Sequence, residues 1–211
     1  MSLQFKPVRS IARFVSTVFH PLFLPLYTVW IYFYLSPRYF LPQNIKFLIY
    51  YLVIVSVLIP LLFFGAMYSA GLFTSLQTKN PKERFFLSVI MTVVYIIIFN
   101  KILHYKQYIE LYPFFLGIIL AVSTTGIYNF FNKKPSLHAM AIGGGWTFLA
   151  IWSYYTHIDI LIFLSLFILL GSIVIASRLY INAHDKSEIL RGLSIGILMQ
   201  ITAFLIAYRY L

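Results

Sequence analysis

Residues 160–208 decide the fold, reading ILIFLSLFILLGSIVIA, then SRLYINAHDKSE, then ILRGLSIGILMQITAFLIAY. The outer two runs are long and apolar enough to cross a membrane, since a spanning helix needs about 20 mostly apolar residues. The middle stretch, residues 177–188, contains an arginine, a histidine and a carboxylate one helical turn after that histidine. We therefore predict two spanning helices joined by a polar segment that carries chemistry.

The composition extends this pattern to the whole chain of 211 residues, of which 61% are hydrophobic and 10% charged. A soluble domain has roughly 45–50% apolar residues, so the excess indicates a membrane protein. The first apolar run is too long for a signal peptide and no small-residue cleavage site follows it, so we expect the early spans to remain in the membrane. The chain has no cysteine, which excludes disulfides, thiolate chemistry and cysteine metal sites.

The net charge is +11, from 16 Lys and Arg against 5 Asp and Glu. In a soluble protein this charge would suggest nucleic acid. Here the basic residues lie at the ends of apolar runs, where they meet anionic lipid headgroups, and they can also bind the phosphate of a lipid substrate. We expect membrane lipids and an amphiphilic lipid phosphate as partners, and no nucleic acid; the sequence leaves the oligomeric state open.

Apolar runs separated by polar interruptions predict an all-α, polytopic membrane helical bundle with about six to seven transmembrane helices. We expect a single integral-membrane domain over residues 1–211, in which residues 1–13 form a short interfacial segment. The predicted spans, to within a few residues, are 14–35, 47–68, 85–103, 111–131, 139–155, 160–176 and 189–208.

Polar clusters follow the second, fourth and sixth of these spans. They cover residues 77–84, 132–138 and 177–188. An even number of crossings separates each pair of clusters. All three are therefore predicted on the same membrane face, where they can form one site.

In the third cluster, His184 and Glu188 are four residues apart and would share one face of a helix. A carboxylate there can accept a hydrogen bond from one imidazole nitrogen and make the other a better nucleophile or base. Arg178 has a planar fork that suits phosphate oxygens. The alternative is a solvated loop, in which Glu188 favours the start of the last helix.

The other two clusters add a hydroxyl, a second histidine and further cations. Ser136 lies where a helix would begin, and backbone N–H groups there can cradle an anion. His138 can act as a general acid, and Lys79, Lys82 and Arg84 can clamp a phosphate. The alternatives are a helix cap with an interfacial histidine, and a basic loop at headgroup level. A zinc site is disfavoured, because no two histidines occur at close helical spacing and the chain has no cysteine.

The third cluster resembles a motif of the type 2 phosphatidic acid phosphatases, a superfamily related to the vanadium haloperoxidases. That motif is Ser-Arg, five residues, His, three residues, Asp. This chain has Ser177-Arg178, then His184 and Glu188 at those spacings. The glutamate keeps the charge of the family's aspartate on a longer arm.

The resemblance extends over about residues 77–195. The family's second motif, Pro-Ser-Gly-His, is similar to residues 135–138, with Leu137 in place of the glycine. The first motif, Lys, six residues, Arg-Pro, aligns on Arg84 with Gln77 and Phe85 at its ends. The candidates to replace its lysine are Lys79, Lys133 and Lys134.

This resemblance implies a metal-independent phosphatase that uses no cofactor and forms a phosphohistidine, because cationic side chains neutralise the developing charge. His184 would attack phosphorus, Glu188 would orient it, and His138 would protonate the leaving group and then help to activate water. The residues expected to bind phosphate oxygens are Arg178, Ser136, Arg84, Lys79 and Lys134.

The implied substrate is a lipid phosphate or pyrophosphate, and the expected location is the inner (cell) membrane of a bacterium, as a multi-pass protein. Two alternatives stay open: a lipid phosphotransferase, in which an alcohol replaces water, and a non-catalytic protein that binds or transports a lipid phosphate. Lys and Arg concentrate on the motif face, which favours the cytoplasmic side, whereas the family more often works on the outer side.

Overall fold

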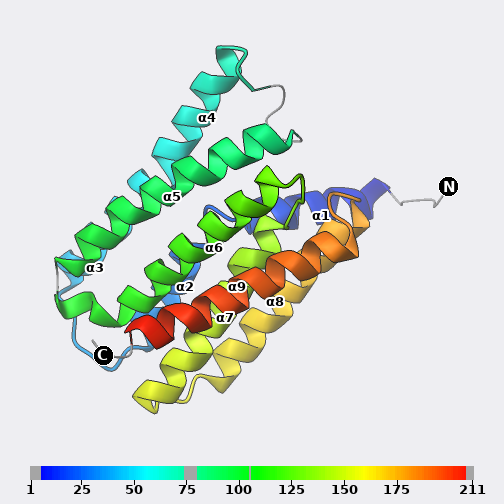
Figure 1. Ribbon diagram of the computed structural model, residues 1–211. Helices are drawn as coiled ribbons and strands as arrows, with labels where there is room; N and C mark the ends of the chain where they lie inside the picture. Colours follow the sequence, from blue (N-terminus) through cyan, green and yellow to red (C-terminus); the bar gives the residue numbers. More distant parts are fainter. Residues whose placement is uncertain (1–5, 74–79, 105, 208–211) are drawn as a thin grey trace.

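The computed structural model describes residues 6–73, 80–104 and 106–207, which form helices joined by short turns (Figure 1). A π-helical segment, Val53–Leu58, joins α3 to α4, and a 3-10 segment, Lys106–Leu111, precedes α6. The α-helices are α1 (Lys6–Val18), α2 (Leu24–Leu35), α3 (Pro42–Leu52), α4 (Ile59–Ser69), α5 (Pro81–Leu103), α6 (Tyr112–Phe130), α7 (Leu137–Thr156), α8 (Leu161–Tyr180) and α9 (Lys186–Ala207).

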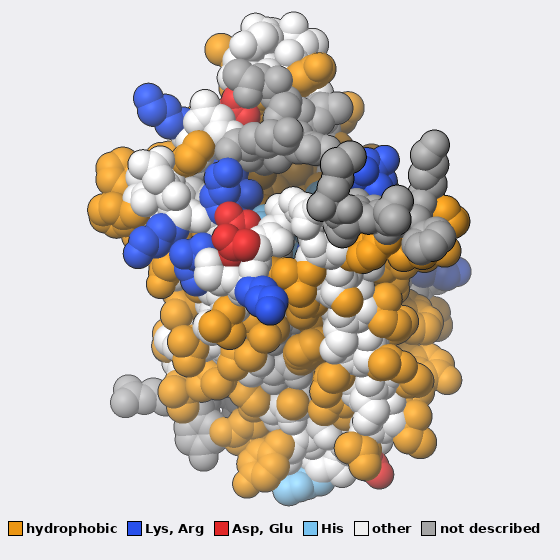
Figure 2. Space-filling model, turned by 90° about the vertical axis from the view of Figure 1, so that its right-hand side faces the viewer, with side chains coloured by type: hydrophobic (Ala, Val, Ile, Leu, Met, Phe, Trp, Pro, Cys, Tyr) orange, Lys and Arg blue, Asp and Glu red, His pale blue; other side chains and the backbone are white. Residues whose placement is uncertain are grey.

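The prediction of an all-α polytopic membrane bundle is confirmed. Large hydrophobic side chains such as Leu62, Ile162 and Leu205 are exposed on the outside, as expected for helices that face lipid. Figure 2 shows Lys and Arg side chains gathered toward one end of the molecule, next to a broad hydrophobic surface. Among the described residues, five stretches are long and apolar enough to cross a membrane: 42–69, 81–102, 107–130, 161–180 and 186–207.

The predicted first span, residues 14–35, is wrong as a single helix. Helix α1 ends at Val18, and α2 starts at Leu24 with Pro25 in its first turn. A proline disfavours helical geometry in the residue before it, here His20 before Pro21, whereas Pro25 is well accommodated in the first turn of α2, so the chain turns between the two helices. Helix α1 instead lies across the end of the bundle against α8 (Figure 1). The predicted interfacial segment therefore extends as a helix to Val18.

Helices α7 and α9 form the most extensive helix pair, and α6 packs against both α5 and α9. Glycines bring α7 and α9 close together. A Cβ on Gly196 would collide with the carbonyl oxygen of Met140, and a Cβ on Gly192 would collide with that of Ser136. Small residues of this kind let helix backbones approach closely in membranes. The starts of α7 and α9 are consequently held side by side.

Candidate active site

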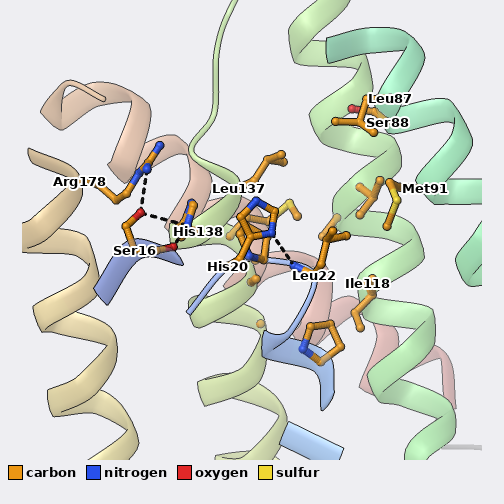
Figure 3. A pocket seen from close by; sticks show the side chains of 18 of the residues that line it. Ser16, His20, Leu22, Leu87, Ser88, Met91, Ile118, Leu137, His138 and Arg178 are labelled. Atoms are coloured by element: carbon orange, nitrogen blue, oxygen red, sulfur yellow. Dashed lines mark hydrogen bonds between the residues drawn. The ribbon is translucent and has the colours of Figure 1, made fainter. Parts of the chain in front are cut away.

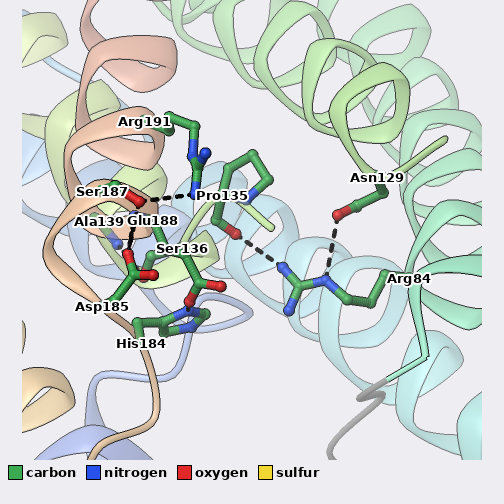
Figure 4. A network of polar contacts seen from close by, with 10 residues as sticks. All are labelled: Arg84, Asn129, Pro135, Ser136, Ala139, His184, Asp185, Ser187, Glu188 and Arg191. Atoms are coloured by element: carbon green, nitrogen blue, oxygen red, sulfur yellow. Dashed lines mark hydrogen bonds and ion pairs between the residues drawn. The ribbon is translucent and has the colours of Figure 1, made fainter. Parts of the chain in front are cut away.

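The turn between α8 and α9 places the predicted histidine–carboxylate pair. The Asp185 Oδ1 atom accepts the backbone N–H of Glu188 at 2.7 Å, which caps the start of α9. His184 therefore precedes the helix on which the sequence analysis placed it. The pair still forms, with His184 Nδ1 2.7 Å from Glu188 Oε2 (Figure 4). The His184 side chain is 8% exposed and that of Glu188 is 18% exposed.

The surroundings of His184 keep its imidazole neutral. Burial lowers the pKa of His184 below its ordinary value of 6.5; the hydrogen bond to Glu188 opposes this effect, and the charge of Arg178 adds to it. With the Nδ1–H donated to the carboxylate, the Nε2 atom has a free lone pair. His184 therefore has the protonation state that a nucleophile needs near neutral pH.

Residues before α7 link the second cluster to the third. Ser136 is the N-cap of α7, where its Oγ accepts the N–H of Ala139 at 3.5 Å. The backbone N–H of Ser136 donates to the carbonyl oxygen of Glu188 at 2.9 Å. The predicted helix start at Ser136 is confirmed. However, Ser136 is fully buried, and its hydroxyl faces the helix end.

Arg84, near the start of α5, links the first cluster to the second. Its Nε–H donates to Asn129 Oδ1 at 3.3 Å, and its Nη2 donates to the carbonyl oxygen of Pro135 at 2.8 Å (Figure 4). Asn129 is itself fixed, because its Nδ2 donates to Ser88 Oγ at 3.3 Å. The guanidinium of Arg84 is therefore held in one orientation by partners on two other parts of the chain.

Helix α1 and the residues just after it add Ser16 and His20, which were not predicted as part of the site. Arg178 Nη1 donates to Ser16 Oγ at 2.8 Å, and His138 Nε2 lies 3.1 Å from the carbonyl oxygen of Ser16 (Figure 3). His20 follows α1 and packs edge-to-face against His138, with 5.6 Å between the ring centroids. The histidine and the arginine predicted from two different clusters therefore meet at one residue of α1.

The side chains of His184, Glu188, Arg84, Arg178, His138, Ser16 and His20 line a cavity of about 940 Å³ that also has an extensive apolar lining. Along α5 the lining runs from Arg84 to Tyr95, a distance of about 16 Å at 1.5 Å per residue. Apolar lining is also contributed by Leu61, Phe64, Met91, Phe114 and Ile118. A cavity of this size and polarity suits an amphiphile with a charged head and a hydrocarbon tail.

The structure brings most of the predicted site residues to this cavity. The predicted residues that line it are His184, His138, Glu188, Arg178, Arg84 and Lys134. Ser136 is not among the lining residues, and Lys79 and Gln77 lie outside the described residues. Three residues in contact with these side chains were not predicted as part of the site: Ser16, His20 and Asn129. The spacing of Arg9, Arg13, Ser16 and His20 on one helical face could have indicated the first two, whereas no local pattern marks Asn129.

A family model described as PAP2 superfamily matches residues 61–210. The chain belongs to the PAP2 superfamily. The match confirms the resemblance that the motifs predicted for this PAP2 protein. The PAP2 superfamily generally hydrolyses phosphoesters. The match begins within α4 and includes α5 to α9, whereas α1 and α2 precede it. Comparisons with curated proteins and with solved structures gave no match.

Proposed function

We propose that this PAP2 protein is an integral-membrane phosphatase that hydrolyses a lipid phosphate or pyrophosphate through a phosphohistidine on His184. The observation that carries the proposal is the 2.7 Å contact of His184 Nδ1 with Glu188 Oε2 on the wall of an amphiphilic cavity. Arg84 and Arg178 line the same cavity. A nucleophile, its orienting carboxylate and two phosphate-binding guanidinium groups are thus together.

In the first step, the Nε2 lone pair of His184 forms a bond to phosphorus, and the bond from phosphorus to the ester or anhydride oxygen breaks. The leaving oxygen keeps that electron pair and takes the Nδ1 proton of the imidazolium form of His138, which becomes neutral. Glu188 stabilises the positive charge that develops on the His184 ring. Arg84 and Arg178 offset the charge on the phosphoryl oxygens.

In the second step, water attacks phosphorus while His138 takes one of its protons. The phosphorus–nitrogen bond breaks, its electron pair returns to His184 Nε2, and inorganic phosphate leaves. Lys134, on the cavity wall, adds positive charge near the phosphate, and Lys79 is proposed to do the same. Ser136 contributes through the start of α7, which it caps. The proposed sequence uses neither a metal nor a cofactor.

The substrate is proposed to place its phosphate at the polar end of the cavity and part of its hydrocarbon tail among the apolar lining residues. The five apolar helices support a multi-pass membrane location, and the proposed location is the inner membrane of a bacterium. Membrane lipids surround the exposed hydrophobic side chains of these helices.

The test is phosphate release from a panel of lipid phosphates and pyrophosphates in detergent micelles, with chelator present. His184→Asn should lower the rate by on the order of 10³-fold or more. His157→Asn is the matched control, because His157 caps α7 at the opposite end of the bundle in a left-handed conformation that asparagine tolerates. Undiminished turnover in His184→Asn would overturn the proposal.

One observation favours a second candidate, a protein that binds lipid phosphates without turnover. Leu137, which replaces the glycine of the second motif, lines the cavity and takes up space near the phosphate position. Tight binding of a lipid phosphate by the wild-type protein, with no phosphate released, would support this alternative. Transfer of phosphate to an added alcohol would instead identify a phosphotransferase.

A further inference from the structure

Helix α1 turns a polar face toward the cavity and an apolar face away from it. Lining residues recur on this helix and just beyond it at a spacing of about three to four positions, which is one helical face. They are Arg9, Arg13, Ser16, Thr17 and, past the end of the helix, His20. The large hydrophobic side chains of the other face are exposed: Val8, Ile11, Phe14 and Val18. This is the pattern of a helix that lies in the membrane interface, here covering the end of the bundle where the site lies.

Ser16 is the residue of α1 that contacts both Arg178 and His138. It is buried, with 5% of its surface exposed. Its hydroxyl oxygen accepts Arg178 Nη1–H at 2.8 Å and lies 3.5 Å from His138 Nε2, and its carbonyl oxygen is 3.1 Å from the same nitrogen. A carbonyl can only accept, so His138 Nε2 carries the proton of this bond and Nδ1 is left for exchange with the substrate or water.

The contact with Ser16 fixes only one corner of the Arg178 fork. The Nε atom of Arg178 is buried and has no hydrogen-bond partner among the described residues. A buried donor without a partner is costly, and a phosphate oxygen would satisfy it. With Nη1 anchored, the guanidinium has less freedom to move before the substrate arrives, which reduces the reorganisation needed in the transition state.

We propose that Ser16 is a positioning residue of the phosphatase site, which orients Arg178 through its hydroxyl and His138 through its carbonyl. This inference rests on the proposed function. It also goes beyond the family motifs, because the superfamily match begins at residue 61 and does not include α1. His20 supports the arrangement by packing against the ring of His138.

Ser16→Ala tests the hydroxyl contact. Without this acceptor, kcat for phosphate release should fall about 10- to 100-fold, the value of a charge-assisted hydrogen bond, while KM changes less than about threefold. Ser16→Thr keeps the hydroxyl and should restore most of the rate. Ser16→Cys is nearly the same size but accepts weakly, so it should resemble Ser16→Ala and serves if the alanine variant does not fold.

The control is Ser172→Ala, which removes an exposed serine of α8 whose hydroxyl bonds only within its own helix, to Ile168 O at 2.8 Å. Its kcat should equal that of the wild-type protein. A double-mutant cycle then separates positioning from a general structural role. If Ser16 acts through Arg178, adding Ser16→Ala to Arg178→Ala should cause no further loss of kcat.

An unchanged kcat in both Ser16→Ala and Ser16→Cys would overturn the inference while leaving the proposed function intact, and so would losses that multiply in the double mutant. Wild-type protein that releases no phosphate from any lipid phosphate would instead overturn the proposed function and this inference with it. The two failures are distinguished by the wild-type rate alone.

Discussion

At the residue scale, Asp185 sets the position of the pair that carries the proposed chemistry. Its Oδ1 accepts both the Glu188 amide and the Ser187 hydroxyl, so the first turn of α9 begins at a fixed point after His184. The bond from the Glu188 amide holds the pKa of Asp185 below its ordinary value, so the cap stays ionised near neutral pH. Glu188 then reaches back one turn to His184 Nδ1.

The burial of His184 predicts the pH dependence of phosphate release. Because its pKa lies below 6.5, the neutral nucleophile should be lost only as the pH falls below that value, which places the acid limb of kcat/KM there. Glu188→Gln removes a charge that raises this pKa, so the acid limb should move to lower pH. The maximal rate should fall about 10²- to 10⁴-fold as the ring loses its orientation. A pH–rate profile measures both effects, and an acid limb displaced to higher pH would contradict this prediction.

Arg84 requires the geometry of an arginine, because its Nε and Nη2 bond to Asn129 and Pro135 in different directions. A lysine has a single ammonium and cannot keep both bonds while facing phosphate. We expect Arg84→Lys to lower kcat/KM about 10- to 100-fold. Arg38→Lys, at an exposed site outside the cavity, should retain the wild-type value in the same assay. Equal kcat/KM values for the wild-type protein, Arg84→Lys and Arg38→Lys would show that phosphate binding does not need the arginine geometry at position 84.

Contacts between residues that are near each other in the sequence could be predicted from the sequence. His184 and Glu188 are four residues apart, and their spacing alone predicted the pair. The contact of Ser16 with Arg178 joins residues 162 positions apart, and the contact of Arg84 with Asn129 joins residues 45 apart. These contacts depend on how the helices pack, which no local pattern encodes.

At the element scale, the error over residues 14–35 has a clear physical origin. Apolar content suggested one span, but Pro21 and Pro25 divide the stretch, and the basic residues Arg9 and Arg13 continue an amphipathic pattern as far as Ser16. Amphipathic periodicity outweighs overall apolar content where charged residues recur every three or four positions. This separation matters for the proposed site, because α1 is the helix whose Ser16 contacts Arg178.

The close pairing of α7 with α9 predicts the effect of a single methyl group. Gly196→Ala should lower the free energy of unfolding by about 1–3 kcal/mol, because its Cβ would collide with the backbone of Met140. Gly144→Ala faces the same interface, but its nearest neighbour would be Gly196 O at 3.8 Å, an ordinary contact. It should be neutral or slightly stabilising, since alanine favours helix over glycine. Denaturant unfolding in detergent compares the two, and equal midpoints would show that the helices can move apart at little cost.

At the scale of the whole molecule, the parity of the predicted spans anticipated that the three polar clusters meet. Bonds from Arg84 to Pro135 and from Ser136 to Glu188 now connect them at one end of the bundle. The error in the first span leaves this count unchanged, because residues 14–35 precede all three clusters. The cavity was not predicted, since its shape depends on side chains from helices that are distant in sequence.

At the opposite end of the bundle, the carboxylate of Glu110 joins side chains from several elements. Removing this carboxylate should lower the free energy of unfolding without changing the site. Glu110, 11% exposed, accepts Tyr32 OH at 3.1 Å and Trp152 Nε1 at 3.0 Å, and its other oxygen pairs with Arg38 at 2.8 Å. Glu110→Gln leaves buried donors poorly paired, so we expect a loss of about 1–3 kcal/mol in unfolding free energy and a change in Trp152 fluorescence.

Arg38→Ala removes only the exposed partner and should cost less than about 1 kcal/mol. Both variants should release phosphate at the wild-type rate well below their unfolding temperature. If Arg38→Ala proved the more damaging, the surface ion pair rather than the buried hydrogen bonds would be what joins α2 to α7.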